Sequence, residues 1–328
     1  SDVCSSDLLE YIKKEILPAN SIGDVKDDDD AIYHVLSGDL VLVFSFTNKS
    51  FYCEAKGYVR RSVGIPVTES VIKGPREGFT EAFVDNVSLI RRKIKDPSLK
   101  FETVILGSKS NTVIVICYIE GVAPNKLVDY IRKKVTNIKL EFILDTNYIE
   151  EALKNKNTPF DTIGTTEKPD VAASKLLEGK VGIIVDGTPF VITAPYFFID
   201  NFQTPDDYYS NKYFANTLRI IRLVSFFLAY LLSGLYLAIS TFHFALLPTV
   251  ITLRLASSRA GVPMPTVIEL LLMTFFFQLL REAGIRLPQS IGQAMSIVGA
   301  LILGDAAVGA GIASQSTIVI VEIGRAHV

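Results

Sequence analysis

The chain contains an apolar run, Leu218 to Leu253, that is interrupted only by Arg219, Arg222, His243 and a few hydroxyl side chains. Leu223–Ile239 with its flanks supplies roughly the 20 residues that an α-helix needs to cross a bilayer. In lipid, a helix satisfies its backbone hydrogen bonds within its own segment. This run therefore predicts a transmembrane helix and divides the chain into parts that fold in different solvents.

Charged residues are spread unevenly on the two sides of this division. Residues 1–211 carry 25 Lys/Arg and 31 Asp/Glu, and residues 212–328 carry the remaining 8 and 4 of the chain's 33 and 35. The first part is acidic and long enough for one or two packed domains. The second part is apolar and slightly basic, as expected for membrane helices with basic flanks.

Residues 9–211 are predicted to form a soluble α+β domain of two lobes. Strand-like and helix-like runs alternate in it without a regular βαβ rhythm. The predicted strands are Leu40–Phe46, Phe51–Lys56, Phe101–Leu106, Thr112–Tyr118, Lys180–Val185 and Pro189–Ile192, and the predicted helices are Leu9–Leu17, Glu77–Ile94, Pro124–Thr136, Asn147–Lys154 and Lys168–Leu177. Asp186-Gly187-Thr188 is a hairpin-turn signal. The acidic run Asp27–Asp30 and the pair Asp206 and Asp207 are expected to be solvated charges.

Residues 212–321 are predicted to be an all-α transmembrane region. Ile291–Ala313 is long enough to cross, whereas Phe244–Leu253 is too short. Val267–Leu280 contains Glu269 and fits either a span or a re-entrant helix. Ser316–Val321 begins a further apolar stretch. The region is therefore expected to be multi-pass, with lipid as its solvent.

The positive-inside rule orients the first span. Arg219 and Arg222 precede it, which predicts that the soluble domain lies in the cytoplasm. Arg254, Arg259, Arg281 and Arg286 would then face outward unless a second crossing or a re-entrant helix intervenes. Both arrangements stay open.

Both ends of the chain resemble translated sequencing-adapter DNA. These segments are 1–8 (SDVCSSDL) and 322–328 (EIGRAHV). We expect neither to be part of the natural protein, which would continue beyond both ends.

Composition argues against several functional classes. The soluble part is acidic and its basic residues are scattered, so no nucleic-acid partner is expected. His34 and His243 lie in different solvents, so no His-based triad, zinc site or other metal or cofactor site can be assembled locally. Cys53 and Cys117 are expected to be buried free thiols. The chain is predicted not to be an enzyme; a membrane-bound hydrolase would need a convergent polar pocket.

A short motif, Gly74, Pro75, Arg76 and Glu77, precedes the predicted amphipathic helix. Gly and Pro fix a tight turn, and Arg76 and Glu77 offer an ion pair. Backbone N–H groups at a helix start and an arginine could instead hold an anion. The motif is therefore either a clamp between lobes or subunits, or a ligand contact.

A charged turn joins the two last long apolar segments. Arg281, Glu282 and Arg286 fit an interfacial loop, and they equally fit pairing across subunits at the gate of a pore. The two interpretations stay open.

The segment that follows this turn is rich in small residues. Gly299 and Gly304 allow close helix packing in an oligomer, and Gln293 and Ser296 share a face that could line a pore. A charged Asp305 in lipid would cost about 2.5–3.5 kcal/mol, so it is expected to be buried, neutral or near water.

An ordered series of motifs runs through both parts of the chain. They are Gly74–Thr80 (GPREGFT), Asn86, Leu89–Arg92 (LIRR), Thr166–Asp170 (TEKPD), Glu178–Pro189 (EGKVGIIVDGTP), Asp206–Tyr209 (DDYY), Leu218–Arg222 (LRIIR) and Arg281–Val308. Through this series the chain resembles the A subunit of bacterial spore germinant receptors, the GerA family, from Leu9 to Val321. Gln278, Asp305 and Lys168 depart from the family pattern, which puts any shared role of these three side chains in doubt.

The resemblance implies a receptor subunit in the inner membrane of a dormant spore. Such subunits act with an integral-membrane B subunit and a lipoprotein C subunit, and they are thought to form a homo-oligomeric ring that conducts ions when a nutrient binds. The implied function is therefore to trigger germination by forming or gating an ion channel. The alternative is a membrane-anchored signalling scaffold that conducts nothing.

Overall fold

The computed structural model describes residues 11, 22–44, 49–53, 61–71, 73–287 and 289–325, with side chains outside the description at 289, 290, 293–296 and 325. Apart from Tyr11, the predicted helix Leu9–Leu17 lies outside the described residues. The chain divides into two compact units. We call them the α+β unit (described residues within 1–70, 76–154 and 163–195) and the helical unit (within 71–75, 155–162 and 196–328).

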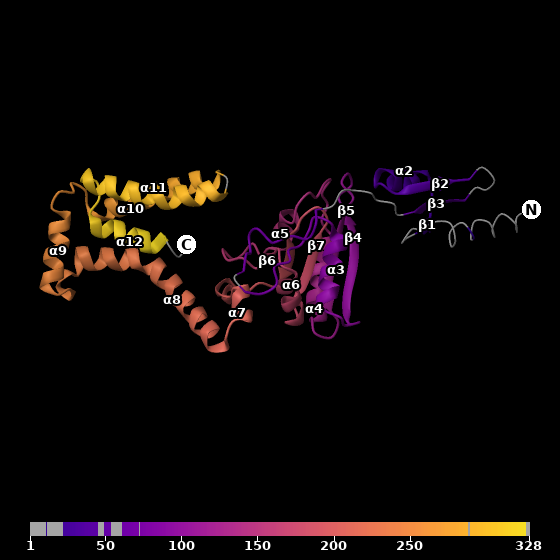
Figure 1. Ribbon diagram of the computed structural model, residues 1–328, viewed down its shortest axis with the longest axis horizontal. Helices are drawn as coiled ribbons and strands as arrows, with labels where there is room; N and C mark the ends of the chain where they lie inside the picture. The colour runs from indigo at the N-terminus through magenta and orange to yellow at the C-terminus, as the bar shows by residue number, and fades with distance from the viewer. Residues whose placement is uncertain are drawn as a thin grey trace, which may run out of the picture. The chain divides into compact units, whose positions relative to one another are not determined.

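A five-stranded antiparallel sheet forms the centre of the α+β unit (Figure 1). Its strand order is β4-β5-β7-β8-β6, with β4 Leu99–Leu106, β5 Thr112–Ile119, β6 Gly164–Thr166, β7 Val181–Val185 and β8 Val191–Ala194. The β4–β5 hairpin and the β7–β8 hairpin confirm the predicted pairs of strands, although β8 begins two residues later than the predicted Pro189–Ile192. Gly187 has φ +92°, as the turn between β7 and β8 requires. Strand β6 was not predicted, because three residues are too few to show periodicity.

Helices cover both faces of this sheet. Helices α4 (Asn125–Thr136) and α5 (Asn147–Leu153) pack on one face, and α3 (Phe83–Lys93) and α6 (Pro169–Leu177) pack on the other. Strand β5 alternates between the two cores: Ile114 and Ile116 face α4 and α5, whereas Val115 and Cys117 face α3 and α6. This period-two pattern fixes the register of the central strand.

Helix α3 begins at Phe83 and not at Glu77, so the predicted start was wrong. Residues before it run extended: the Phe79 N–H donates to the Glu167 carbonyl at 2.7 Å. The Asn86 side chain accepts from the Thr80 N–H at 2.8 Å and donates to the Thr80 carbonyl. These tertiary hydrogen bonds replace the helical ones that the amphipathic pattern favoured.

A small second sheet lies nearer the N-terminus. Its order is β1-β3-β2, with β1 Ile22–Asp24, β2 Leu40–Val43 and β3 Ser50–Cys53, and β2 and β3 form the predicted hairpin. Asp27–Asp30 is not the predicted solvated loop. Asp27 is the N-cap of helix α2 (Asp28–Leu36) and accepts from the Asp30 N–H at 2.8 Å. Acidic side chains stabilise a helix N-terminus, so the run is a helix start.

Helix α8 (Lys212–Leu237) leads the helical unit. It continues through a π-helical turn, Ala238–Phe242, and this 31-residue stretch is the one described helix that is long and apolar enough to cross a membrane. A short 3₁₀ turn, Phe198–Phe202, and helix α7 (Pro205–Tyr209) come before it. The position of α8 agrees with the predicted first span.

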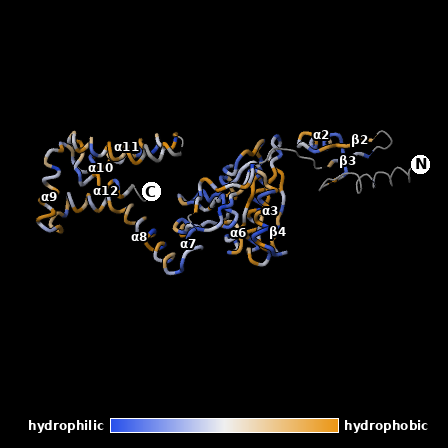
Figure 2. Tube along the Cα trace, viewed as in Figure 1, coloured by the Kyte–Doolittle hydropathy of each residue, from blue (hydrophilic) through white to orange (hydrophobic). Residues whose placement is uncertain are grey.

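Four further helices complete this unit: α9 (Thr249–Arg259), α10 (Thr266–Ile285), α11 (Gln289–Gly309) and α12 (Gln315–Arg325), with a 3₁₀ turn at Phe244–Leu246 before them. Hydrophobic residues recur along α10 and α11 (Figure 2). Helix α10 packs against α11 and α12 around Met273, Phe277, Ala300 and Ala307. Alanines at this interface allow the helices to approach closely.

Candidate functional site

An ion-pair cluster joins α7 to α8, and we call it the junction latch. Both Asp207 oxygens bind Arg222: Nη1 donates to Oδ2 at 2.7 Å and Nη2 to Oδ1 at 2.8 Å. Arg219 Nε donates to the same Oδ2 at 3.1 Å. Thr204 is the N-cap of α7, and its N–H donates to Asp207 at 3.2 Å. The Asp207 side chain is only 1% exposed.

The latch is held together by its charges. Burial would by itself raise the pKa of Asp207, but hydrogen bonds from Arg222, the Thr204 backbone and Arg219 hold that pKa well below its ordinary value. Asp207 is therefore not a solvated charge, and that prediction was wrong. Asp206 accepts a hydrogen bond from the Lys73 backbone N–H at 3.3 Å.

A second polar cluster lies among the apolar helices, and we call it the Glu269 knot. Glu269, in the first turn of α10, is fully buried. Its Oε1 accepts hydrogen bonds from the backbone N–H and the hydroxyl of Ser314, the latter at 2.7 Å. Ser314 precedes α12, and its Oγ lies 3.0 Å from Thr317 Oγ1. A helix N-terminus favours a negative charge, so α12 supports this carboxylate.

The knot also involves α8 and α9. The Tyr236 hydroxyl on α8 lies 3.1 Å from Ser316 Oγ. Arg259 Nε on α9 lies 3.8 Å from Glu269 Oε2, and both atoms are buried without a hydrogen-bond partner among the described residues. Residues of α9 and the start of α12 thus meet the α10 carboxylate, and α8 joins the cluster through Ser316; the second Glu269 oxygen has no hydrogen bond among the described residues. A buried carboxylate oxygen without a hydrogen bond is costly, so closer pairing of Arg259 with Glu269 would stabilise the site.

The predicted clamp residues divide between the two units. Gly74 and Pro75 belong to the helical unit, and Arg76 and Glu77 belong to the α+β unit. Gly74 has φ +123°, and a Cβ there would lie 2.6 Å from the Tyr209 ring, so only glycine fits. Glu77 pairs with Arg92 and Lys93 of α3 and not with its neighbour. The motif therefore lies where the chain passes from one unit to the other.

The residues predicted to pack or to line a pore lie on α11. A Cβ at Gly304 would lie 3.1 Å from Ile318 of α12, and one at Gly299 would lie 3.5 Å from Leu280 of α10. Both glycines therefore face neighbouring helices of the same chain. The side chains of Gln293 and Ser296 lie outside the described ones.

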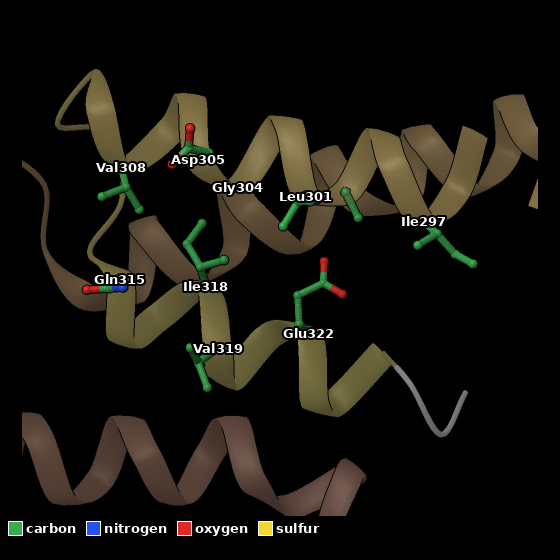
Figure 3. A pocket seen from close by; sticks show the side chains of 10 residues that line it. Ile297, Leu301, Gly304, Asp305, Val308, Gln315, Ile318, Val319 and Glu322 are labelled. Carbon is green, nitrogen blue, oxygen red and sulfur yellow. The ribbon is translucent and has the colours of Figure 1, made fainter. Parts of the chain in front are cut away.

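A groove of about 520 Å³ separates part of α11 from α12 (Figure 3). Ile318 points from α12 toward α11, and Leu301 and Val308 point from α11 toward α12. Asp305 lines the groove, but its side chain is exposed and its carboxylate points away from α12. Asp305 is thus exposed within the described chain, and the expectation that it is neutral or near water stays a prediction.

The charged residues predicted as a turn lie at the C-terminal end of α10, because Arg281 and Glu282 are inside the helix and Arg286 is its C-cap. Arg286 donates to Glu282 at 3.0 Å, one helical turn away, and both side chains are exposed. An exposed pair of this kind contributes little to stability, and it leaves both predicted roles of the turn open.

Sequence reasoning missed the two clusters that the fold assembles. It treated Glu269 only as a charge that weakens a transmembrane prediction. Glu269 lies 45 positions before Ser314, so periodicity could not pair them. An available signal was an acidic residue in an apolar helix shortly after an arginine, because such charges in lipid rarely lack a partner.

Comparison with known proteins identifies the family of this chain. Residues 2–325 match the family described as Bacillus/Clostridium GerA spore germination protein. This range includes most of both terminal segments interpreted as adapter sequence, an interpretation that stays a prediction.

Comparison with individual proteins supports the same family. Spore germination protein KA of Bacillus subtilis (strain 168) is 39% identical over 316 residues, which cover 96% of this chain and 58% of the relative. The uncharacterized membrane protein YfkQ of the same organism is 41% identical, covering 88% of this chain and 56% of the relative. Spore germination protein GerLA of Bacillus cereus is 37% identical, covering 90% and 60%. The chain thus spans less than two thirds of the length of these relatives.

The chain is also similar to a solved structure. That structure is the N-terminal domain of the A subunit of the Bacillus megaterium spore germinant receptor GerK3, with 43% identity, 37% coverage of this chain, 97% coverage of that chain and a TM-score of 0.31. With a family match over nearly its whole length, the chain belongs to the GerA family of spore germination proteins.

Proposed function

We propose that this chain is a subunit of a nutrient receptor that triggers spore germination, and that its helical unit forms or gates a path for ions in the spore inner membrane. It acts as a homo-oligomer with an integral-membrane B subunit and a lipoprotein C subunit, and its α+β unit lies on the cytoplasmic side. The observation that carries the proposal is the Glu269 knot. A buried carboxylate among apolar helices is costly and is typical of ion pathways and gates.

The Glu269 knot supplies a means of gating. Glu269 is hydrogen-bonded to Ser314, while Arg259 lies just beyond hydrogen-bond distance of its second oxygen. A small movement of α9 relative to α10 would form or lengthen this ion pair. In a low-dielectric region such a change has a large energetic effect. We infer that the knot switches between a paired and an unpaired arrangement of Arg259 and Glu269 when α9 moves relative to α10.

The junction latch supplies a means of transmission. Asp207 fastens the segment that leads into α8 to two arginines of that helix. A displacement of residues 196–211 is then passed to α8 by a rigid bidentate pair instead of being absorbed by a flexible linker. Arg76 and Glu77 follow Gly74 and Pro75 where the chain enters the α+β unit, and Glu77 fastens that end to Arg92 and Lys93 of α3.

Ion flux through planar bilayers or proteoliposomes that contain the full-length subunit tests the proposal. Glu269→Gln keeps the shape of the side chain but leaves Arg259 without an anion, and it should change the flux by roughly tenfold or more. Glu120, between β5 and α4, has a side chain that is 65% exposed, and Glu120→Gln should leave the ion flux unchanged.

The pore-lining role is tested separately. Substitution of Gln293, Ser296 and Asp305 should alter conductance or ion selectivity. Flux that is insensitive to these changes would remove the pore-lining claim. Absence of flux from the unsubstituted subunit would refute conduction and leave the non-conducting scaffold, which predicts that removal of residues 9–211 abolishes partner recruitment.

A further inference from the structure

A groove of about 800 Å³ lies in the helical unit, where α8, α9 and α12 meet. Most of its wall is aliphatic and includes Leu232 and Leu235 of α8, Ile239 of the π-helical turn after it, Leu255 of α9, and Ile320 of α12. A cavity of this size and composition fits a hydrocarbon chain better than a hydrated solute.

One part of the groove is polar. Ser258 of α9 and Ser316 of α12 line it, with their hydroxyl oxygens 3.3 Å apart, and the Tyr236 hydroxyl lies 3.1 Å from Ser316. Arg254 also lines the groove and precedes Ser258 by one turn of α9, so the two share a helix face. Gln315, the first residue of α12, brings a helix N-terminus to the same place. Positive charge and hydroxyl donors therefore line the same cavity as the aliphatic side chains.

Two groups in the groove, Arg254 and Ser240, lack partners among the residues that the structure describes. Arg254 is exposed, and no carboxylate of the described residues lies within ion-pair distance of its guanidinium. Ser240 Oγ is buried without a hydrogen-bond partner in the described part of the chain. Ser240 lies in the π-helical turn Ala238–Phe242, a distortion that often marks a functional position in a helix. Both groups are donors that an anionic, oxygen-rich ligand would satisfy.

We propose that this groove binds one anionic phospholipid. The phosphate pairs with Arg254, the glycerol and ester oxygens accept hydrogen bonds from the hydroxyl groups, and an acyl chain lies along α8 and α12. Arginine suits a phosphate because it offers several donors in one plane. The proposal requires that these helices lie in a membrane, but it does not require that they conduct ions.

Native mass spectrometry of the full-length subunit in detergent micelles tests the site. Phosphatidylglycerol and phosphatidylcholine with the same acyl chains are titrated in turn. We expect phosphatidylglycerol to be retained with roughly tenfold higher affinity, as a charge-assisted contact provides. Arg254→Gln should remove this preference. Ile251→Trp, which fills the groove without changing charge, should weaken both lipids. Lys212→Gln, at the start of α8 and outside the groove, should leave binding unchanged.

Other results would overturn the proposal. These are equal retention of the two lipids by the unsubstituted subunit, equal effects of Arg254→Gln and Lys212→Gln, or displacement of the lipid by inorganic phosphate alone, which would indicate a soluble anion. A photo-crosslinker at Leu255 that captures another polypeptide instead of lipid would also overturn it. Because binding is measured without ion flux, failure here is distinguishable from failure of the proposed conduction.

Discussion

Removal of the Asp207 charge should loosen the junction latch selectively. Asp207→Asn preserves the shape of the side chain, but it removes the bidentate pairing with Arg222 and leaves two arginines without an anion. Breaking a buried ion pair costs about 3–5 kcal/mol. Arg222 is 30% exposed, so water compensates part of the loss, and we expect a cost near the lower end, about 3 kcal/mol. This corresponds to a change of roughly a hundredfold in a local opening equilibrium.

Hydrogen–deuterium exchange of peptides from residues 196–222 measures this opening directly. A global unfolding midpoint would not isolate this segment, because it reports on the rest of the chain as well. Exchange in Asp207→Asn should accelerate by roughly a hundredfold in this segment. Asp206→Asn is the matched control: Asp206 accepts a single 3.3 Å hydrogen bond from Lys73 N–H and should change exchange only slightly.

The pH dependence has a definite sign. The pKa of Asp207 is lowered in the folded state, so the latch contributes its full stability above the ordinary carboxyl pKa of about 3.9 and loses it as the pH falls below that value. The difference between the unsubstituted chain and Asp207→Asn should therefore shrink in acid. Acceleration below roughly threefold at neutral pH, or equal acceleration in Asp206→Asn, would refute the reasoning.

Three further outcomes are expected. Burial raises the pKa of Cys117 to about 12, so iodoacetamide near pH 8 should label this thiol only after unfolding. Mass spectrometry detects the label, and rapid labelling of the folded chain would contradict the burial of Cys117. Burial also raises the pKa of Glu69, whose carboxylate accepts a hydrogen bond from the Thr166 hydroxyl at 2.6 Å, so the contribution of Glu69 to stability is present in acid and lost as the pH rises. Glu69→Gln should therefore raise the thermal midpoint at neutral pH and flatten the pH dependence of that midpoint. A lowered midpoint at neutral pH would contradict this prediction. Gly187→Ala adds a Cβ to a backbone at φ +92° with open space around it, so thermal melts should show a loss of about 1 kcal/mol from backbone strain alone, and no loss would contradict the turn geometry.

Local patterns predicted many of the elements correctly. Alternating β-branched residues gave β4 and β5, and the Asp186-Gly187-Thr188 turn gave the β7–β8 hairpin, because strand period and turn chemistry are properties of neighbouring residues. The errors occurred where contacts distant in sequence override local preference. Helix α3 starts late because Glu167 and Asn86 bind the preceding segment in an extended form.

The sequence by itself determined that residues after Leu218 form apolar helices, that the preceding part mixes strands and helices, and that the chain resembles the GerA family. Hydropathy, periodicity and the order of motifs are properties of the sequence alone, so they can be recognised without the tertiary structure. Only the tertiary structure decided that Glu269 meets Ser314 and Arg259, and that Asp207 binds Arg222. The reason is physical: whether a charge is solvated or buried depends on which helices pack around it, and that packing is the sum of many weak contacts over the whole unit.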